Sequence, residues 1–230
     1  MPNFLVFQLK APLASFGSTV GTYRATDTRP RRSAVLGLVA AAIGIERSES
    51  ARFAALSRDV RVATLAVRQP TVLVDFHTVQ APAKLLGQTR REQLATGQPN
   101  CIPTRREYLQ DGHWVIVLEG EQALLQECER ALEQPVFPLY VGRKSCVLSA
   151  HVAGRVIEST SAEAAVKQWV ARMSDKGPDA VRLPAAPAIY WDEGMSVEGD
   201  AQVRHLRNDQ RTSLAHPFFA PRLEFEGTLC

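Results

Sequence analysis

The chain has 230 residues, with 27 Lys and Arg against 24 Asp and Glu; 45% of its residues are hydrophobic and 22% are charged. This composition is typical of a globular protein and argues against disorder, collagen-like repeats and a disulfide-dense miniprotein. The longest uncharged apolar run, residues 34–45, is shorter than the roughly 20 residues that a membrane-spanning helix needs. The first residues lack a signal-peptide pattern, so we expect a cytoplasmic protein with no membrane partner.

The four cysteines, Cys101, Cys128, Cys146 and Cys230, are far apart and form no CxxC pair. Zinc sites and disulfide frameworks have closer or more regular spacings. We therefore expect reduced thiols, no metal and no cofactor.

The basic residues are concentrated in the first two thirds of the chain. Residues 1–149 hold 18 basic and 13 acidic side chains, whereas residues 150–230 hold 9 and 11. Three segments, residues 24–32, 84–106 and 143–144, together carry 11 cations. Arginine outnumbers lysine 22 to 5, which fits phosphate recognition but also fits a GC-rich genome. The clustering itself predicts an anionic partner.

The first elements in chain order are a strand over residues 4–9, an irregular loop, and a helix over residues 34–45 that is buried nearly all round. Ser33 is expected to cap this helix and Gly44 to end it. Because a helix N-terminus attracts anions, four residues at its start predict a phosphate site. The alternative is a solvated basic turn. The four residues are Arg29, Arg31, Arg32 and Ser33.

The next elements are less regular. Residues 60–68 and 71–80 are predicted to be a strand pair joined by a turn at Gln69–Pro70. Residues 81–106 are basic and broken by Pro and Gly, which indicates a long loop that is either functional or disordered. A strand over 113–118, a helix over 121–133 and a final segment over 135–146 complete the order of a ferredoxin-like α+β domain, a sheet with helices on one face.

The last third of the chain gives weaker signals. Residues 161–173 predict a helix, residues 184–194 predict a loop, and residues 201–211 are mostly polar. No internal repeat is present. We expect a domain over residues 1–149 and a small, partly β region over residues 150–230.

The sequence lacks the standard enzyme motifs for nucleotide, zinc or nucleophilic-serine chemistry. Metal-independent RNA cleavage needs a general base, a general acid and a cation, for which His77, Tyr108 and Arg106 are candidates. The competing interpretation makes His77 a strand residue with a structural or RNA contact. Asp75 shares its face of the strand and either orients the ring or neutralises an arginine.

Five blocks of the sequence, in the same order, closely resemble the CasD family, the small RAMP-type subunits of the type I-E CRISPR Cascade complex. They cover the chain up to about residue 146. The blocks are APLASFG after the first strand, RPRRSAVLGLVAAAIGI at 29–45, DFHTVQ at 75–80, RREYL at 105–109 and PVFPLYVGRKSC at 135–146.

The resemblance implies a ferredoxin-like RRM domain with an inserted basic thumb arm, at about residues 80–106, and a small C-terminal β-containing region. It implies a non-catalytic antiviral-defence subunit that caps the 5′ handle of the CRISPR RNA. The implied partners are the large subunit, the backbone subunits and, through the complex, target DNA. In this subtype a different subunit cuts the guide.

Single-stranded RNA is gripped through phosphates, stacked bases and 2′-hydroxyls, which favours Arg, aromatic and hydroxyl side chains. The residues and the resemblance together predict no catalytic residue and an RNA site made of Tyr23, Arg24, Arg29, Arg31, Arg32, Ser33, His77, Gln80, Arg105, Arg106, Tyr140, Arg143, Lys144 and Ser145. The open alternative is an endoribonuclease that processes repeat RNA; a weaker one is a general RNA-binding module.

Overall fold

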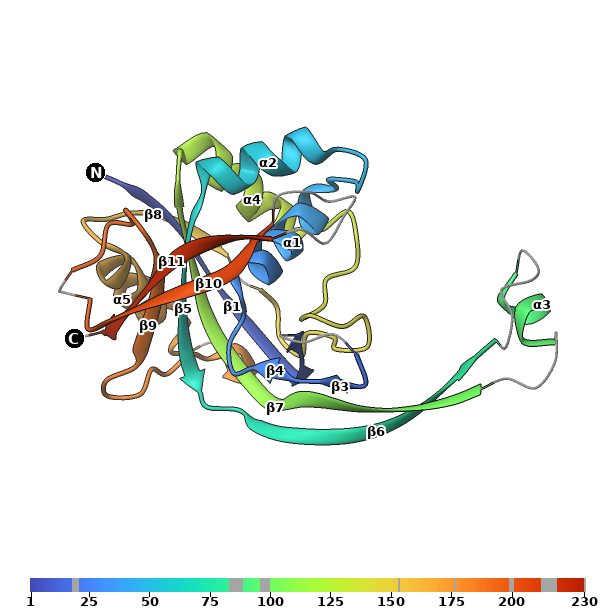
Figure 1. Ribbon diagram of the computed structural model, residues 1–230. Helices are drawn as coiled ribbons and strands as arrows, with labels where there is room; N and C mark the ends of the chain where they lie inside the picture. The colour runs from blue at the N-terminus through green and yellow to red at the C-terminus, as the bar shows by residue number, and fades with distance from the viewer. Residues whose placement is uncertain are drawn as a thin grey trace.

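The computed structural model describes residues 1–17, 21–82, 89–95, 100–152, 154–175, 177–198, 201–211 and 219–229. Within these ranges, nine strands form one sheet, four α-helices and a short 3-10 helix lie in the body of the protein, and α3 (Arg90–Ala95) lies at the tip of an arm (Figure 1). No helix in these ranges is long and apolar enough to cross a membrane.

The strands are β1 (Asn3–Ala14), β2 (Phe16–Gly17), β3 (Tyr23–Arg24), β4 (Thr26–Asp27), β5 (Arg61–Arg68), β6 (Thr71–Ala81), β7 (Asn100–Gly120), β8 (Arg155–Glu158), β9 (Ala188–Asp192), β10 (Val203–Arg211) and β11 (Phe219–Thr228). The helices are α1 (Arg32–Ile43), α2 (Ser50–Asp59), α3 (Arg90–Ala95), α4 (Gln122–Glu133), α5 (Ala162–Met173) and the 3-10 helix η1 (Gly177–Asp179).

The main path of the sheet runs β10-β11-β9-β5-β7-β1-β8, and all neighbours on it are antiparallel. Strands β8, β9, β10 and β11 come from residues after 150, so the last third of the chain extends the same sheet. The small strands β2 and β4 pair separately.

Both faces of the central sheet are buried. Alternate residues of β1 point to opposite sides: Leu5 and Phe7 join a core that includes α1 and α4, whereas Phe4 and Val6 join a second core with Trp169 of α5. The helices α1, α2 and α4 of residues 1–149 lie on one face, and α5 of the last third of the chain covers the other. The apolar run in β1 does not alternate with polar residues because both of its faces are covered.

The predicted strand pair at Gln69–Pro70 was wrong. Strand β5 pairs with β7 from Arg61 to Arg68, and β6 pairs with the preceding part of the same β7 strand. Thus β5 and β6 follow one another along a single partner. A tight two-residue hairpin needs a positive φ that Pro70 cannot adopt, which explains the failure.

Strand β6 and the first half of β7 leave the body of the protein as a long two-stranded arm (Figure 1). The predicted loop at 81–106 therefore contains regular structure, since α3 lies within it and β7 begins at Asn100. The sequence pattern does not indicate these elements, because much of the arm is exposed and no buried face requires apolar and polar residues to alternate. Residues 83–88 and 96–99 of the predicted loop lie outside the described residues.

Several local predictions are confirmed, and two need correction. Gly44 ends α1 in the left-handed conformation, at φ 85, and α4 and α5 lie where the helical spacing placed them. Ser33 is inside α1 and does not cap it, because the helix begins at Arg32. The predicted loop at 184–194 contains β9, and the polar residues 201–211 contain β10.

Candidate nucleic-acid interface

The N-terminus of α1, where a phosphate site was predicted, already holds an anion from the same chain. The backbone N–H of Arg32 donates to the Asp209 carboxylate of β10 at 3.1 Å. The Arg32 guanidinium is buried and donates to Asp192 at 2.7 Å and to Ser57 Oγ at 3.0 Å. The cations at this helix start are therefore offset internally, and we leave Arg32 out of the proposed RNA site.

Arg29 is similarly engaged. Its side chain pairs with Glu224 of β11 and lies over the ring of Tyr190, 3.5 Å from the ring centroid. Burial opposes ionisation of Glu224, but Arg29 and Arg222 outweigh it and hold the pKa of that carboxyl below its ordinary value. The Arg29 side chain is therefore engaged by a carboxylate and a ring of the same chain.

A cleft of ≈ 770 Å³ lies beside α1, and it brings together four of the predicted residues: Arg31, Ser33, Tyr140 and Lys144. Its floor is the small-residue face of α1, and the segment 137–144 forms another wall. Four cations line it: Arg31, Arg47, Lys144 and Arg211. Arg31 also pairs with Asp27.

Aromatic side chains form the walls of this cleft. Phe137, Tyr140 and Phe219 line it and are 40%, 38% and 44% exposed. Exposed rings beside cations are what a single-stranded nucleic acid needs for base stacking and phosphate contact. A cleft of this size and composition can hold a short stretch of nucleotides.

The turn that carries Arg143, Lys144 and Ser145 is fixed by a close backbone contact. Gly142 has φ 90, and a Cβ at this position would lie 1.7 Å from the Ser15 carbonyl oxygen. The backbone N–H of Ser15 donates to the carbonyl of Val141 at 3.2 Å. Only glycine fits here, so this turn is held against the end of β1.

Arg143 points from this turn toward the arm. Its guanidinium lies 4.4 Å from the ring centroid of Tyr108 on β7. Its Nη1 is buried and has no hydrogen-bond partner among the described residues. Lys144 and Ser145 are exposed. The turn therefore connects the cleft with the base of the arm.

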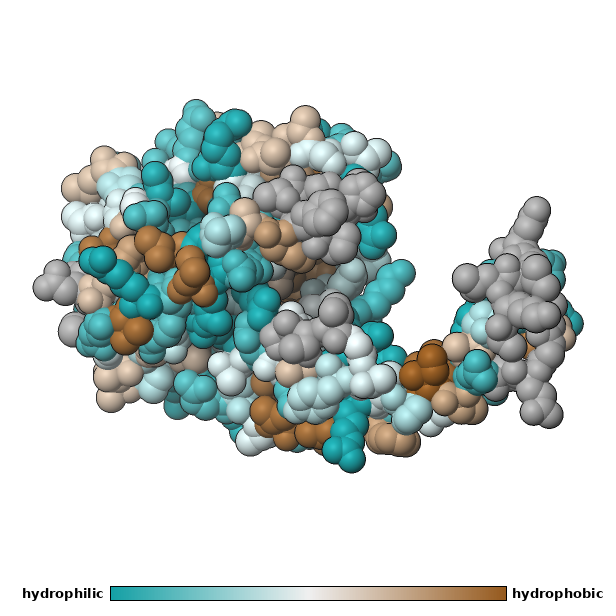
Figure 2. Space-filling view, in the orientation of Figure 1, coloured by the Kyte–Doolittle hydropathy of each residue, from teal (hydrophilic) through white to brown (hydrophobic). Residues whose placement is uncertain are grey.

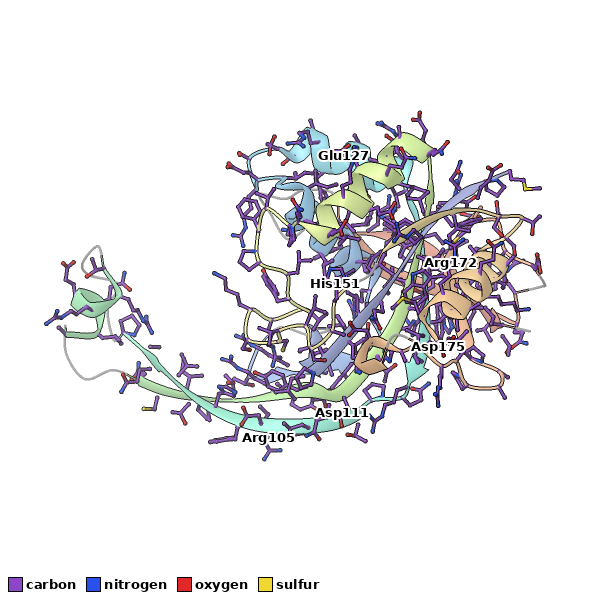
Figure 3. The ribbon with its side chains drawn as sticks, turned by 180° about the vertical axis from the view of Figure 1, so that it is seen from behind. Arg105, Asp111, Glu127, His151, Arg172 and Asp175 are labelled. Carbon is purple, nitrogen blue, oxygen red and sulfur yellow. The ribbon has the colours of Figure 1, made fainter. Side chains whose placement is uncertain are left out.

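At its base the arm has three strands, because β3 pairs in parallel with β7. The register places Phe76, Arg105 and Tyr23 side by side across β6, β7 and β3. Residues paired in this way share a face, and Phe76 and Tyr23 are 65% and 50% exposed. Figure 3 shows Arg105 on the arm, away from the helices. This face, the aromatic platform, presents two rings around one cation.

Tyr23 is held in place on the aromatic platform by a neighbour on β7. Its hydroxyl donates to the Glu107 carboxylate, which also accepts the backbone N–H of Thr26 at 2.9 Å. The hydrogen bond to Glu107 is the main cause that raises the pKa of Tyr23. The ring is therefore oriented before any ligand binds.

Apolar side chains continue along the same face of β6. Val72 and Val74 are 52% and 53% exposed and alternate with residues of the opposite face. Figure 2 shows hydrophobic side chains gathered along the lower side of the arm base. Gln80 lies further along this face, and its carbonyl accepts a hydrogen bond from Arg90.

The remaining predicted residues lie on the opposite face of the arm base. The register aligns Arg24 and Arg106 with Asp75, and His77 Nε2 lies 2.5 Å from Asp75 Oδ2. Asp75 and His77 are therefore in contact on this face, but no hydrogen bond to the described residues fixes Nε2 of the ring. The arm separates the predicted residues into two groups that face opposite ways.

The candidate catalytic residues do not form one cluster. His77 pairs with Thr104 and Tyr108 pairs with Leu73, so four residues separate them along the ribbon. At roughly 3.3 Å per residue this is about 13 Å, too far for a base and an acid to act on one phosphodiester. Tyr108 is also buried under Arg143. Among the described residues, no group of three His, Cys, Asp or Glu side chains is arranged to hold a metal ion.

Sequence reasoning missed Arg47, Arg211, Phe137, Phe219 and Phe76. Phe137 lies in the block 135–146, and its position close to Tyr140 in the sequence could have indicated a second stacking ring. Arg47 and Arg211 are isolated in sequence and 164 positions apart, and only the fold brings them to one cleft.

Comparison with known proteins places the chain in the class of CRISPR-associated proteins. A family model described as "CRISPR-associated protein (Cas_Cas5)" matches residues 4–227. CRISPR system Cascade subunit CasD of Escherichia coli (strain K12) is 32% identical over 161 residues, which cover 65% of this chain and 69% of that protein. The chain therefore belongs to the CasD/Cas5 family.

Two solved structures share the fold. A chain from a CRISPR RNA-guided surveillance complex matches with a TM-score of 0.69 at 21% identity, over 98% of this chain and 90% of that one. A crystal structure of a Cas protein matches with a TM-score of 0.62 at 27% identity, over 98% and 94% of the two chains. The mixed α/β architecture with a large antiparallel sheet is thus a known one.

Proposed function

We propose that this protein is a non-catalytic subunit of a CRISPR Cascade complex that binds and caps the 5′ handle of the CRISPR RNA. The relative with 32% identity is a Cascade subunit. The observation that carries the proposal is the cleft beside α1, where Arg31, Lys144 and Tyr140 meet other cations and aromatic rings. Such a cleft suits a splayed single strand better than a duplex.

The aromatic platform on the arm is proposed as a second contact. Tyr23, Arg105 and Phe76 present a stacking surface to a base or to a neighbouring chain of the complex. Arg24, His77 and Arg106 on the other face of the arm, together with Gln80, Arg143 and Ser145, are proposed to contact the strand where it passes between cleft and arm. The remaining partners are the large and backbone subunits and, through them, target DNA, in the cytoplasm.

The finer description of the fold belongs to the same proposal. We interpret β1, β5, β7 and β8 with α1 and α4 as a ferredoxin-like RRM core of the RAMP type. The antiparallel order β5-β7-β1-β8 and the position of α1 and α4 on one face support it. Residues 1–149 would form this domain, with the thumb at about 80–106, and residues 150–230 the C-terminal region, whose first strand β8 completes the sheet beside β1.

The test is co-expression of the tagged protein with a CRISPR array and the other candidate subunits, followed by sequencing of the RNA that copurifies. We expect mature guides with one uniform 5′ handle, and their loss from a Tyr140→Ala, Lys144→Ala double variant. Lys167→Ala, which removes an exposed charge on α5, is the matched control and should retain the guides. Heterogeneous RNA in the wild-type complex would contradict the handle-capping role.

The endoribonuclease alternative is tested by incubating repeat RNA with the isolated protein without metal. We expect no product, because His77 and Tyr108 are separated along the arm. Cleavage that His77→Ala abolishes would replace the non-catalytic proposal. Equal affinity for random and repeat RNA would favour the general RNA-binding module.

A further inference from the structure

The end of the cleft formed by Arg47 and Arg211 carries a feature that neither the family nor the sequence blocks assign. Arg47 is exposed in the connection between α1 and α2, and Arg211 is the last residue of β10. Both line the cleft, 164 positions apart in sequence, with Glu46 and Phe219 beside them.

Arg47 and Arg211 line the same cleft. Burial lowers the pKa of Arg211, and the positive charge of Arg47 lowers it further. Of the acidic side chains in the same connection, Glu49 pairs with Arg52 at 2.8 Å, and Glu46 contacts the Ser48 hydroxyl at 3.5 Å. Within the described residues neither of them forms an ion pair with Arg47. The described residues that line the cleft carry four cationic side chains and one acidic side chain, Glu46, so the cleft favours an anionic ligand.

The position of Arg211 is set by the buried ion pairs at the start of α1. Asp209 accepts the N–H of Arg32, and Arg222 donates to Asp209 at 2.6 Å and to Asp192 at 2.8 Å. Arg211 follows Asp209 by two residues on the same face of β10. The ion pairs that fix β10 against α1 therefore also hold Arg211 at the cleft.

We propose that Arg47 and Arg211 together bind one backbone phosphate of the RNA strand that occupies the cleft. The inference rests on the proposed function and adds a subsite to it. Two guanidinium groups supply planar, paired donors that match a phosphate, and Phe219 provides a stacking surface next to it. The subsite gives residues 150–230 a direct role in RNA binding, because Arg211 comes from that region.

The test measures binding of fluorescent repeat RNA to the full-length protein as a function of salt. Arg47→Ala and Arg211→Ala are each expected to lower affinity about tenfold at low salt, since charge-assisted hydrogen bonds are lost. The salt slope should fall by about 0.7 in total in the double variant, because the slope counts neutralised phosphates and the two arginines share one. The fold-loss of affinity in the double variant should be smaller than the product of the two single fold-losses, because both residues bind the same phosphate.

Two controls separate this subsite from general effects. Arg58→Ala removes an exposed charge from α2, outside the cleft, and should leave the affinity unchanged. The thermal midpoint of the free protein should stay equal or rise in Arg47→Ala, because a repulsion is removed. A fall in affinity that matches a fall in thermal midpoint would overturn the proposal.

The Tyr140→Ala, Lys144→Ala variant distinguishes the two proposals. If it loses RNA while the Arg47 and Arg211 variants bind as wild type does, the subsite is wrong and the proposed function stands. If none of the variants changes RNA binding, the proposed function is contradicted as well. Additive losses from Arg47→Ala and Arg211→Ala would contradict the shared phosphate.

Discussion

Arg32 at the start of α1 and Arg47 at the cleft are the same residue type in two different electrostatic settings. Arg32 is surrounded by Asp192, Ser57 and backbone oxygens, whereas Arg47 is exposed at the cleft without an ion-pair partner among the described residues. The first setting stabilises the fold, and the second leaves charge for a ligand. An arginine-rich segment is therefore no sign of a phosphate site until its internal carboxylates are located.

The largest expected effect is a loss of folding stability when the buried ion pairs lose a cation. Arg222→Ala would leave Asp192, Asp209 and Glu224 close together without their shared cation. Loss of one partner from a buried ion-pair group costs about 3–5 kcal/mol. We expect this loss in the free energy of unfolding, measured by urea denaturation.

The matched control for that variant is Lys144→Ala, whose side chain is exposed at the cleft. It should unfold at the wild-type urea concentration. If Arg222→Ala and Lys144→Ala had equal stability, the distinction between interior and cleft cations would fail.

A smaller loss is expected at the turn that presents the cleft cations. Gly142→Ala introduces both a left-handed strain of about 1–3 kcal/mol and a clash with the Ser15 carbonyl. Gly177 also has a positive φ, 60, but nothing lies within 4 Å of its Cβ position. Gly177→Ala should therefore show the strain alone. Thermal unfolding of both variants checks this, and equal losses would contradict the close contact at Ser15.

The aromatic platform should respond in binding and not in stability. Phe76→Ala removes an exposed ring, and base stacking on such a ring is worth about 1–3 kcal/mol. We expect weaker binding of repeat RNA at an unchanged thermal midpoint. Val72→Ala on the same face is the control, since Val72 is exposed to a similar degree but cannot stack. If both variants bind RNA as tightly as wild type does, the platform is not an RNA contact.

The last effect is absent at neutral pH and develops only as the pH falls. His113 is buried in β7, contacts Gln8 at 3.0 Å, and has a pKa lowered to about 4 by burial and by Lys10. Because the unfolded chain takes up this proton near pH 6.5 and the folded chain does not, stability falls as the pH drops from about 6.5 to 4. His113→Gln should flatten the stability curve in this window, as measured by urea unfolding at several pH values. An unchanged slope would show that His113 does not contribute.

Prediction from the sequence succeeded where a local signal decides the structure. The positions of α4 and α5 and the end of α1 at Gly44 follow from periodicity and from backbone freedom. Tyr140 and Lys144 were recognised because a ring and cations are adjacent in sequence, and the fold places both in the cleft.

Prediction from the sequence failed where residues far apart in the chain determine the structure. Nothing near Arg32 in the sequence indicates that Asp192 and Asp209 supply its counter-charges. The β6 strand was expected to pair with β5, and only the length of β7 reveals that both share this one partner. No local signal in the sequence indicated that Arg47 and Arg211 line the same cleft.

Because β7 runs without interruption from the arm into the core, insertions in the sequence could lengthen the arm. Strand β7 has 21 residues, and its second half is locked into the core through Val115 and Ile116. Two extra residues inserted in β6 and two opposite them in β7 would move the tip outward by about 6.6 Å and keep every side chain on its face. A single extra residue in each strand would turn the side chains beyond it to the opposite face. The reach of the arm can therefore be adjusted in steps of two residues without altering the core.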